Sequence, residues 1–374
     1  MLGIYVHLPF CPYICPYCDF AKWPHRASSA ARYLAALSAE IERERPRPAG
    51  SIFLGGGTPN TYEAQQIARL LTHLQTRFPT HGECEITTEL NPELVRDGDL
   101  GAYRAAGINR VSIGVQSFAQ AEIATLGRRH TPAQVEGVVG AARTAGMNSV
   151  SLDLIFAVPG QTPRSWHESL DAAIALGVDH ISTYGLTVEE GTPYASWQQR
   201  EPSAFFDDGA EAEFYEIAIE TLERAGYEHY EISNFARPGH RCVHNENYWE
   251  NGEYVGLGVG AASYIDGERS VHTRDLQAYL QAIDEATPIP SESEKLQGAR
   301  RAGEAVMLAL RTAQGVSLAG FKERYGLDFL DFYAPVVRRF AGDGLLLVDA
   351  ERVRLTKRGR FVANDVCGAF VTFA

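Results

Sequence analysis

The sequence has little cysteine, little positive charge and no long hydrophobic run. Its 374 residues include six cysteines, too few for the dense disulfide framework of a small secreted protein. With 34 Lys and Arg against 47 Asp and Glu, the formal net charge is −13. This balance argues against a nucleic-acid or anionic-membrane partner, because both are bound through basic side chains. No apolar run has the length of a transmembrane segment, and the first residues lack the basic region of a signal peptide.

These absences indicate a protein of the reducing cytoplasm, where thiols stay free to bind a metal. Hydrophobic residues at 45% and charged residues at 22% are ordinary for a soluble globular protein. The chain is long for one compact domain, so we expect a large catalytic or binding domain with a smaller one attached.

Short runs of β-forming residues recur up to about residue 186, with amphipathic helices between them. We expect strands near residues 3–7, 51–54, 85–90, 110–115, 149–155 and 180–186. Mostly apolar strands that alternate with helices predict a parallel sheet covered by helices. The first strand–helix loop lacks the glycine fingerprint of a Rossmann fold. The expected architecture is therefore an α/β protein with a partial (β/α)6 barrel.

The strand–helix rhythm stops near residue 235. We place a barrel domain at residues 1–235 and a smaller α+β domain at residues 236–374. Within the second domain, residues 317–366 read as two helices, a hairpin and a helix, an order that resembles a winged helix. Because the chain is acidic, DNA binding is disfavoured, and we expect this segment to pack against the barrel or cover it.

The segment FCPYICPYCDF gathers three thiols in one loop after the first expected strand. These are Cys11, Cys15 and Cys18. In β/α barrels the carboxyl ends of the strands carry the chemistry. Thiolates suit zinc and iron–sulfur clusters, and a [4Fe–4S] cluster held by three cysteines leaves one iron open to a small molecule. The alternative is zinc with His7, Asp19 or His25 as fourth ligand, although structural zinc sites usually use paired C-x2-C elements.

Further motifs follow the other expected strands. They are GGGTP from Gly55, ELNPE with Glu89, GVQSF with Gln116, LGRRH with Arg128, and DLIFAVPGQT with Asp153. Consecutive glycines let a backbone approach a ligand, and a carboxylate inside an apolar strand needs a ligand or a hydrogen-bonding partner. Each motif alone is compatible with an ordinary turn or a solvated side chain. Their shared position at the carboxyl ends of successive strands predicts one binding site.

Together with YEISNFA and HNENYW, these motifs resemble the oxygen-independent coproporphyrinogen III oxidase family of radical S-adenosylmethionine (SAM) proteins, in order and over nearly the whole chain. The resemblance implies that SAM chelates the open iron and that the reduced cluster splits it to a 5′-deoxyadenosyl radical. It implies SAM contacts at Tyr5, Gly56, Gly57, Thr58 and Glu89. The positions that contact a second SAM in the oxidase correspond to Tyr17, Gln116, Arg128 and Asp153.

Two departures from the oxidase are similar to the haem-chaperone branch of the family. The oxidase has another cysteine two residues after the third, where this sequence has Phe20, and it has an N-terminal extension before its cluster loop. The motif HNENYW at residues 244–249 also matches that branch. The resemblance then implies a protein that binds haem and passes it to an acceptor protein, with a reductant or electron donor for the cluster. The departures argue against decarboxylation and against a second SAM.

The segment RCVHNENYW leaves two interpretations open. His244 is suited to ligate haem iron, with Tyr248 and Trp249 stacked on the porphyrin, and Cys242 is a rival ligand. Alternatively, aromatic residues beside a hydrogen-bonded histidine are common packing. The leading hypothesis is a haem chaperone with a [4Fe–4S] cluster and exchangeable SAM. The alternative is radical decarboxylation of coproporphyrinogen III to protoporphyrinogen IX.

Overall fold

The structure is a computed structural model that describes residues 1–373, apart from the side chains at positions 81 and 83. Its largest element is a twelve-stranded sheet in the order β14-β13-β12-β11-β1-β4-β5-β6-β7-β8-β10-β9. The six central strands are parallel neighbours, which confirms the expected β/α architecture. They are β1 (Leu2–Leu8), β4 (Ala49–Gly56), β5 (Thr80–Leu90), β6 (Arg110–Gln116), β7 (Ser149–Phe156) and β8 (His180–Gly185).

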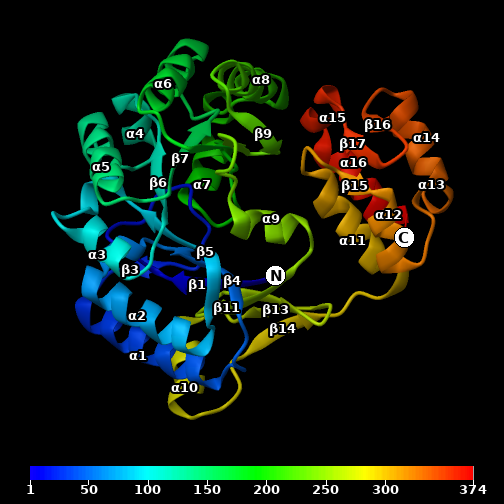
Figure 1. The fold of residues 1–374 in the computed structure, drawn as a ribbon. Coiled ribbons are helices and arrows are strands. Elements are labelled where there is room, and N and C mark those ends of the chain that lie inside the picture. The colour runs from blue at the N-terminus through cyan, green and yellow to red at the C-terminus, as the bar shows by residue number, and fades with distance from the viewer. Residues whose placement is uncertain (374) are drawn as a thin grey trace.

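Helices cover the outer face of these strands (Figure 1). Local sequence explains where they begin: at α6 the Thr162 hydroxyl accepts the backbone N–H of Ser165, and Pro163 occupies the first turn. The helices that follow β1 to β7 are α1 (Ala27–Arg43), η1 (Pro59–Thr61), α2 (Ala64–Arg77), η2 (Pro92–Leu94), α3 (Asp99–Ala105), α4 (Gln120–Thr125), α5 (Pro132–Thr144) and α6 (Pro163–Ala175). After β8 come α7 (Pro193–Arg200), η3 (Pro202–Ala204) and α8 (Asp208–Arg224).

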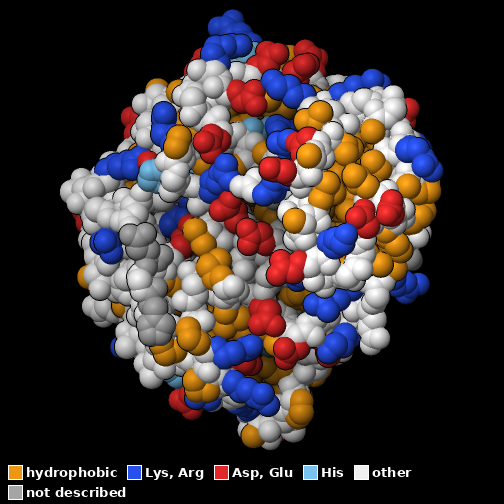
Figure 2. All heavy atoms as spheres, turned by 45° about the vertical axis from the view of Figure 1, so that its right-hand side comes forward, with side chains coloured by type: hydrophobic (Ala, Val, Ile, Leu, Met, Phe, Trp, Pro, Cys, Tyr) orange, Lys and Arg blue, Asp and Glu red, His pale blue; other side chains and the backbone are white. Residues whose placement is uncertain are grey.

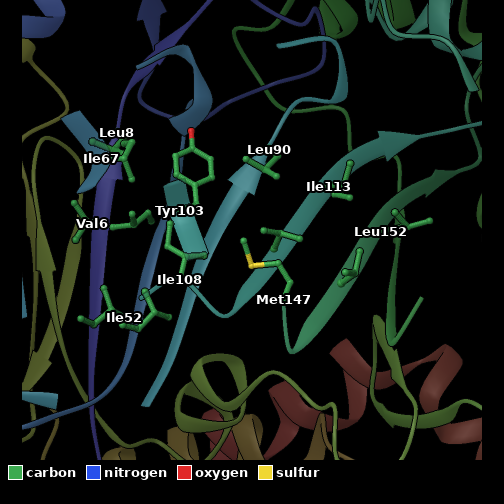
Figure 3. Packing of buried hydrophobic residues seen from close by; sticks show 14 of the residues in the cluster. Val6, Leu8, Ile52, Ile67, Leu90, Tyr103, Ile108, Ile113, Met147 and Leu152 are labelled. Carbon is green, nitrogen blue, oxygen red and sulfur yellow. The ribbon is translucent and has the colours of Figure 1, made fainter. Parts of the chain in front are cut away.

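The main hydrophobic core is made by side chains of the parallel strands and of the helices around them. Figure 3 shows Val6 and Leu8 of β1, Ile52 of β4, Ile113 of β6 and Leu152 of β7 along neighbouring strands, and all five are fully buried. Burial of this apolar surface is the main term that stabilises the sheet. The result is a rigid frame whose carboxyl edge holds the loops that carry the expected motifs.

After α8 the chain returns to the same sheet. Antiparallel strands follow β8 at one edge, and β11 pairs in parallel with β1 at the other, followed by antiparallel strands. The boundary that we place at residue 235 therefore marks the end of the strand–helix rhythm, whereas a second hydrophobic core begins only at Ala302. The elements of this region are β9 (Glu228–Glu231), β10 (Asn234–Ala236), α9 (Val243–Trp249), β11 (Glu253–Leu257), β12 (Ala262–Ile265), β13 (Glu268–His272), α10 (Leu276–Asp284) and β14 (Ser291–Glu294).

The second core belongs to a small α+β domain. Within residues 317–366, two helices separated by a four-residue helical segment precede a hairpin and a further helix, an order close to the winged-helix-like expectation. Exposed hydrophobic side chains of this domain include Leu347 and Phe373, and Figure 2 shows hydrophobic atoms gathered on its surface. Along residues 1–373, no helix combines the length and the apolar character of a membrane span. The elements are α11 (Gly298–Leu310), β15 (Val316–Ser317), α12 (Leu318–Tyr325), α13 (Phe329–Phe332), α14 (Ala334–Gly342), β16 (Leu346–Val348), β17 (Arg352–Leu355), α15 (Lys357–Phe361) and α16 (Ala363–Phe373).

Candidate functional site

The three-cysteine loop is closed at its base. Strand β2 (Phe10–Cys11) pairs in parallel with β3 (Trp23–Pro24), and the backbone N–H of Trp23 donates to the Pro9 carbonyl at 2.9 Å. The Phe10 side chain is 1% exposed and packs among core aromatic rings. The loop between β2 and β3 therefore projects from a buried anchor at the carboxyl end of β1.

Cys11, Cys15 and Cys18 are half-buried free thiols that line the same pocket. Burial raises the pKa of Cys11 to about 11, and repulsion from the other two thiols adds to this, although a hydrogen bond with Thr58 opposes it. Burial also raises the pKa of Cys18. In the absence of a cation, Cys11 and Cys18 stay protonated at neutral pH, and a metal cluster supplies the positive charge that stabilises thiolates. The donor set therefore fits a [4Fe–4S] cluster.

The zinc alternative needs a fourth ligand, and its three candidates have other partners. The ring nitrogens of His7 lie 3.0 Å from a tyrosine hydroxyl and 2.7 Å from a backbone carbonyl. The Asp19 carboxylate pairs with Arg274 at 3.3 Å, and the ring of His25 packs edge-on against neighbouring aromatic rings. Among the residues that the structure describes, no three His, Cys, Asp or Glu side chains are grouped as a single-ion site.

The glycine-rich loop after β4 lies directly against the cysteine loop. The backbone N–H of Gly57 donates to the Leu8 carbonyl at 2.9 Å. A Cβ atom on Gly57 would lie 2.6 Å from that same oxygen. Gly56 has a φ of +104°, and its Cβ position lies 2.3 Å from the ring of His7. Only glycine fits at these two positions, so the backbone here can approach a ligand closely.

Two carboxylates lie in the pocket and influence each other. Glu89, near the end of β5, accepts the backbone N–H of Gly56 at 3.0 Å, and burial together with repulsion from Asp153 raises its pKa to about 8. Asp153 accepts from the Ser112 hydroxyl at 3.0 Å, and burial raises its pKa as well. The Glu89 carboxyl therefore holds a proton at neutral pH until a cationic ligand, such as an amine or a sulfonium, favours its charged form.

Gln116 and Arg128 are held in place by the backbone of β6. Gln116 has a φ of 64°, a left-handed conformation that is costly for a residue other than glycine, and the register between β6 and β7 shifts at this point. The Arg128 guanidinium donates to the Gly114 carbonyl at 2.6 Å and to the Asn91 side chain at 2.9 Å. Backbone strain of this kind concentrates where a side chain must face a ligand.

These loops enclose a pocket of about 460 Å³ at the carboxyl ends of the strands. Tyr5 does not line it, and instead its ring stacks on Phe53 and its hydroxyl lies 3.0 Å from His7. Asn91 does line it and was missed, although its place directly after β5 was an available signal. The expected residues that line the pocket are Cys11, Cys15, Tyr17, Cys18, Gly56, Gly57, Thr58, Glu89, Gln116, Arg128 and Asp153.

The HNENYW helix α9 lies toward the opposite ends of the strands. The His244 side chain is 1% exposed, with Nδ1 2.8 Å from the Ser51 hydroxyl and Nε2 2.8 Å from the Tyr248 hydroxyl. Its ring packs against Phe53, with centroids 5.3 Å apart. Burial lowers the pKa of His244 to about 3, so the imidazole is neutral. The structure therefore does not bring His244 to the cysteine pocket.

The other members of the motif face in different directions. Cys242, the rival ligand, is 1% exposed and donates to Glu85 at 3.5 Å, and burial raises the pKa of its thiol to about 12. Trp249 lies on the outer side of α9, where the Arg311 guanidinium is 5.4 Å from its ring centroid. In this arrangement His244 and Cys242 are both buried and engaged with protein partners, so neither presents a free atom to haem iron.

The fold and the cysteine pocket define a radical SAM protein. The model of the Radical SAM superfamily matches residues 5–173, and that of the HemN C-terminal domain matches residues 296–362. Membership of this superfamily implies a [4Fe–4S] cluster and SAM. The grouped thiols, the close glycine backbone and the buried carboxyl of Glu89 suit that pair of cofactors.

Full-length relatives define the family more closely. Heme chaperone HemW of Bacillus subtilis is 34% identical over 99% of both chains, and the Mycobacterium tuberculosis protein of the same name is 36% identical over 97% of this chain and 93% of its own. The chain belongs to the HemW family. The solved structure of coproporphyrinogen III oxidase (HemN) from Escherichia coli, described as a radical SAM enzyme, is similar with a TM-score of 0.87. It is 26% identical and covers 100% of this chain and 90% of that one.

Proposed function

We propose that this protein is a haem chaperone that binds haem, carries a [4Fe–4S] cluster with exchangeable SAM, and transfers haem to acceptor proteins. The observation that carries the proposal is the set of relatives named heme chaperone HemW, which align over nearly the whole chain. The exposed side chain of Phe20 at the rim of the pocket supports it, because the oxidase pattern requires a thiol at this position.

In this proposal the cofactors occupy the pocket at the carboxyl ends of the strands. When bound, the cluster would supply an electron for reductive cleavage of SAM. The backbone of Gly56 and Gly57 would hold SAM close to the cysteine loop. Glu89 would lose its proton when SAM binds, and its carboxylate would then face the positive charge of the ligand. The cluster ligands are Cys11, Cys15 and Cys18. The proposed SAM contacts are Gly56, Gly57, Thr58 and Glu89, which line this pocket, whereas Tyr5, the fifth position that the resemblance implies, does not line it.

Haem is the cargo, and His244 is its proposed iron ligand, with Cys242 as the rival. Both side chains are engaged by other groups in this structure, so haem binding at either one requires a movement of α9. The acceptor is a haem-dependent protein, and a reductant or electron donor serves the cluster. We propose the cytoplasm as the compartment, because the described cysteines are all free thiols.

A second candidate function is the oxidative decarboxylation of coproporphyrinogen III. The observation that favours it is the convergence of the remaining polar positions on one pocket in a fold similar to HemN over the whole chain. In the oxidase these positions contact a second SAM. They are Tyr17, Gln116, Arg128 and Asp153. The pocket therefore has the groups for this reaction, and the side chain at position 20 is the feature that argues against it.

One experiment separates the two functions. The protein is reconstituted anaerobically with iron and sulfide, titrated with haem, and then incubated with coproporphyrinogen III, SAM and a reductant. We expect stoichiometric haem binding and no protoporphyrinogen. Formation of protoporphyrinogen would establish the oxidase and overturn the proposal. A chain that neither binds haem nor turns over the porphyrinogen would also overturn it.

A further inference from the structure

Helix α9 is held at its two ends by charged side chains from different parts of the molecule. The Glu85 carboxylate of β5 accepts the backbone N–H groups of Val243 at 3.2 Å and of His244 at 3.0 Å. At the other end, the Arg324 guanidinium of α12 donates to the carbonyls that follow the helix, those of residues 250 and 251, at 3.2 and 3.0 Å. A negative group at the start and a positive group at the end satisfy the free backbone groups and complement the helix dipole.

The position of α9 makes these contacts a bridge between the barrel and the C-terminal domain. Figure 1 shows α9 between the parallel strands and α11. Glu85 belongs to the barrel sheet, and Arg324 belongs to the domain with the second core. The inner face of α9 turns His244 toward Ser51, and the outer face turns Trp249 toward Arg311. The position of α9 is therefore fixed by contacts with both domains.

A groove of about 340 Å³ lies on the outer side of α9. One wall is formed by Glu246 and Trp249 of α9, and the other by Phe321 and Tyr325 of α12. Arg324 also lines the groove and spans it to reach the end of α9. There is thus open space into which α9 can move, and the guanidinium contact opposes that movement.

The inner side of α9 offers no such space. The ring of His244 packs against Phe53, and a Cβ atom built on Gly3 would lie 3.2 Å from its Cε1 atom. In either tautomer the neutral imidazole of His244 has one lone pair, on Nε2 beside the Tyr248 hydroxyl or on Nδ1 beside the Ser51 hydroxyl, and each hydroxyl is 2.8 Å away. That lone pair is the one that iron would use, and a flat macrocycle cannot reach it between α9 and the sheet.

We propose that haem iron reaches His244 only after α9 moves into this groove, and that the Arg324 contact is the latch that controls the movement. The proposal rests on the proposed function, because it assumes that haem is the cargo. It assigns the haem site to the amino-terminal side of the sheet, away from the cysteine pocket. The work of releasing α9 lowers the apparent haem affinity by the fraction of molecules in which the helix is open.

The test is a substitution of Arg324. Although loss of a contact usually weakens binding, loss of this one should strengthen haem binding, because it favours the open position of α9. Haem is titrated into the full-length reconstituted protein, and the absorbance of the bound haem is followed. Arg324→Ala should raise the apparent affinity about tenfold, since it removes two charge-assisted hydrogen bonds that hold the closed state. Arg324→Lys keeps the charge but cannot hold both carbonyls, and it should give a smaller gain. Amide hydrogen exchange at residues 243–249 should become faster in both variants.

The matched control is Arg338→Ala, because this exposed arginine of α14 is outside the residues that line the groove. It should leave the haem affinity unchanged. In the Arg324→Ala background, His244→Ala should abolish the gain and change the spectrum of the bound haem. Binding that is indifferent to both His244 and Arg324 would overturn this inference and leave the chaperone proposal standing. Absence of haem binding in every variant would overturn the chaperone proposal itself.

Discussion

Two glutamates of strand β5 show how differently the two ends of the barrel are built. Glu85 accepts hydrogen bonds from Cys242, Val243 and His244 at the start of α9, and its carboxylate also lies 4.0 Å from Nε of Arg110. Four residues further on, Glu89 accepts one from the backbone of Gly56, and its pKa is raised to about 8. A carboxylate that holds structure is satisfied by protein groups, whereas one that awaits a ligand is not. The carboxyl end of the strands is therefore the end prepared for chemistry.

The largest expected effect comes from removing the thiols at that end. Replacement of Cys11, Cys15 and Cys18 by Ala should abolish the visible absorbance of the reconstituted cluster and reduce bound iron from about four atoms per chain to none, because no ligands remain. Cys84→Ala is the control, since this thiol is outside the pocket, and it should keep the iron. Iron retained by the triple variant would contradict the ligand assignment.

The next effect tests whether the glycine backbone approaches the ligand. Gly57→Ala places a Cβ atom 2.6 Å from the Leu8 carbonyl, so the loop must shift. We expect SAM affinity to fall on the order of a hundredfold and the free energy of unfolding to fall by about 1–3 kcal/mol. Equilibrium binding measurements report the SAM affinity, and thermal melts report the loss of stability.

Gly137→Ala provides the matched glycine control. Gly137 lies in α5 with open space at its Cβ position, so alanine there should be neutral or stabilising by up to about 1 kcal/mol. Normal SAM affinity in Gly57→Ala would show that the close contact at the carboxyl end has no role in binding.

The sequence predicts that the motif residues gather at the carboxyl ends of the parallel strands, because their position along each strand is visible in the order of the chain. Each motif lies within or directly after the carboxyl-terminal half of a strand, so a parallel sheet brings Cys11, Gly56 and Asp153 to the same end. The sequence did not predict the position of α9. That position depends on a contact between Ser51 and His244, which are 193 positions apart. Nor did it predict that the sheet continues to β14, because that strand, SESE, is polar and fully exposed and carries no pattern of burial.

A smaller effect concerns the charge of Glu89. Because its pKa is raised to about 8 from 4.5, a proton must leave when a cationic ligand binds below that pH. SAM affinity should therefore rise by up to tenfold per pH unit toward about pH 8 and then level off. The proton held by the folded chain stabilises it below about pH 4.5, and this contribution is lost as the pH rises through about 8.

The measurement for Glu89 is SAM binding by calorimetry from about pH 6.5 to about pH 9, with the released protons counted. Glu89→Gln cannot ionise, so it should show only the weaker pH dependence of the ligand's own amine. Parallel curves for the wild-type protein and the variant would mean that Glu89 is already charged before the ligand binds. The contrast between the two glutamates would then disappear.

The smallest effect on stability is expected at Phe20, the position at which the oxidase pattern has a thiol. Its side chain is 65% exposed at the rim of the pocket, so Phe20→Cys should change the free energy of unfolding by less than about 0.5 kcal/mol. Cluster content and haem binding should also stay the same, and we expect no turnover of coproporphyrinogen III. Turnover in this variant alone would mean that one side chain at the carboxyl end separates the two activities. The contacts that hold α9 at the amino-terminal side of the sheet would then not contribute to the difference between the two activities.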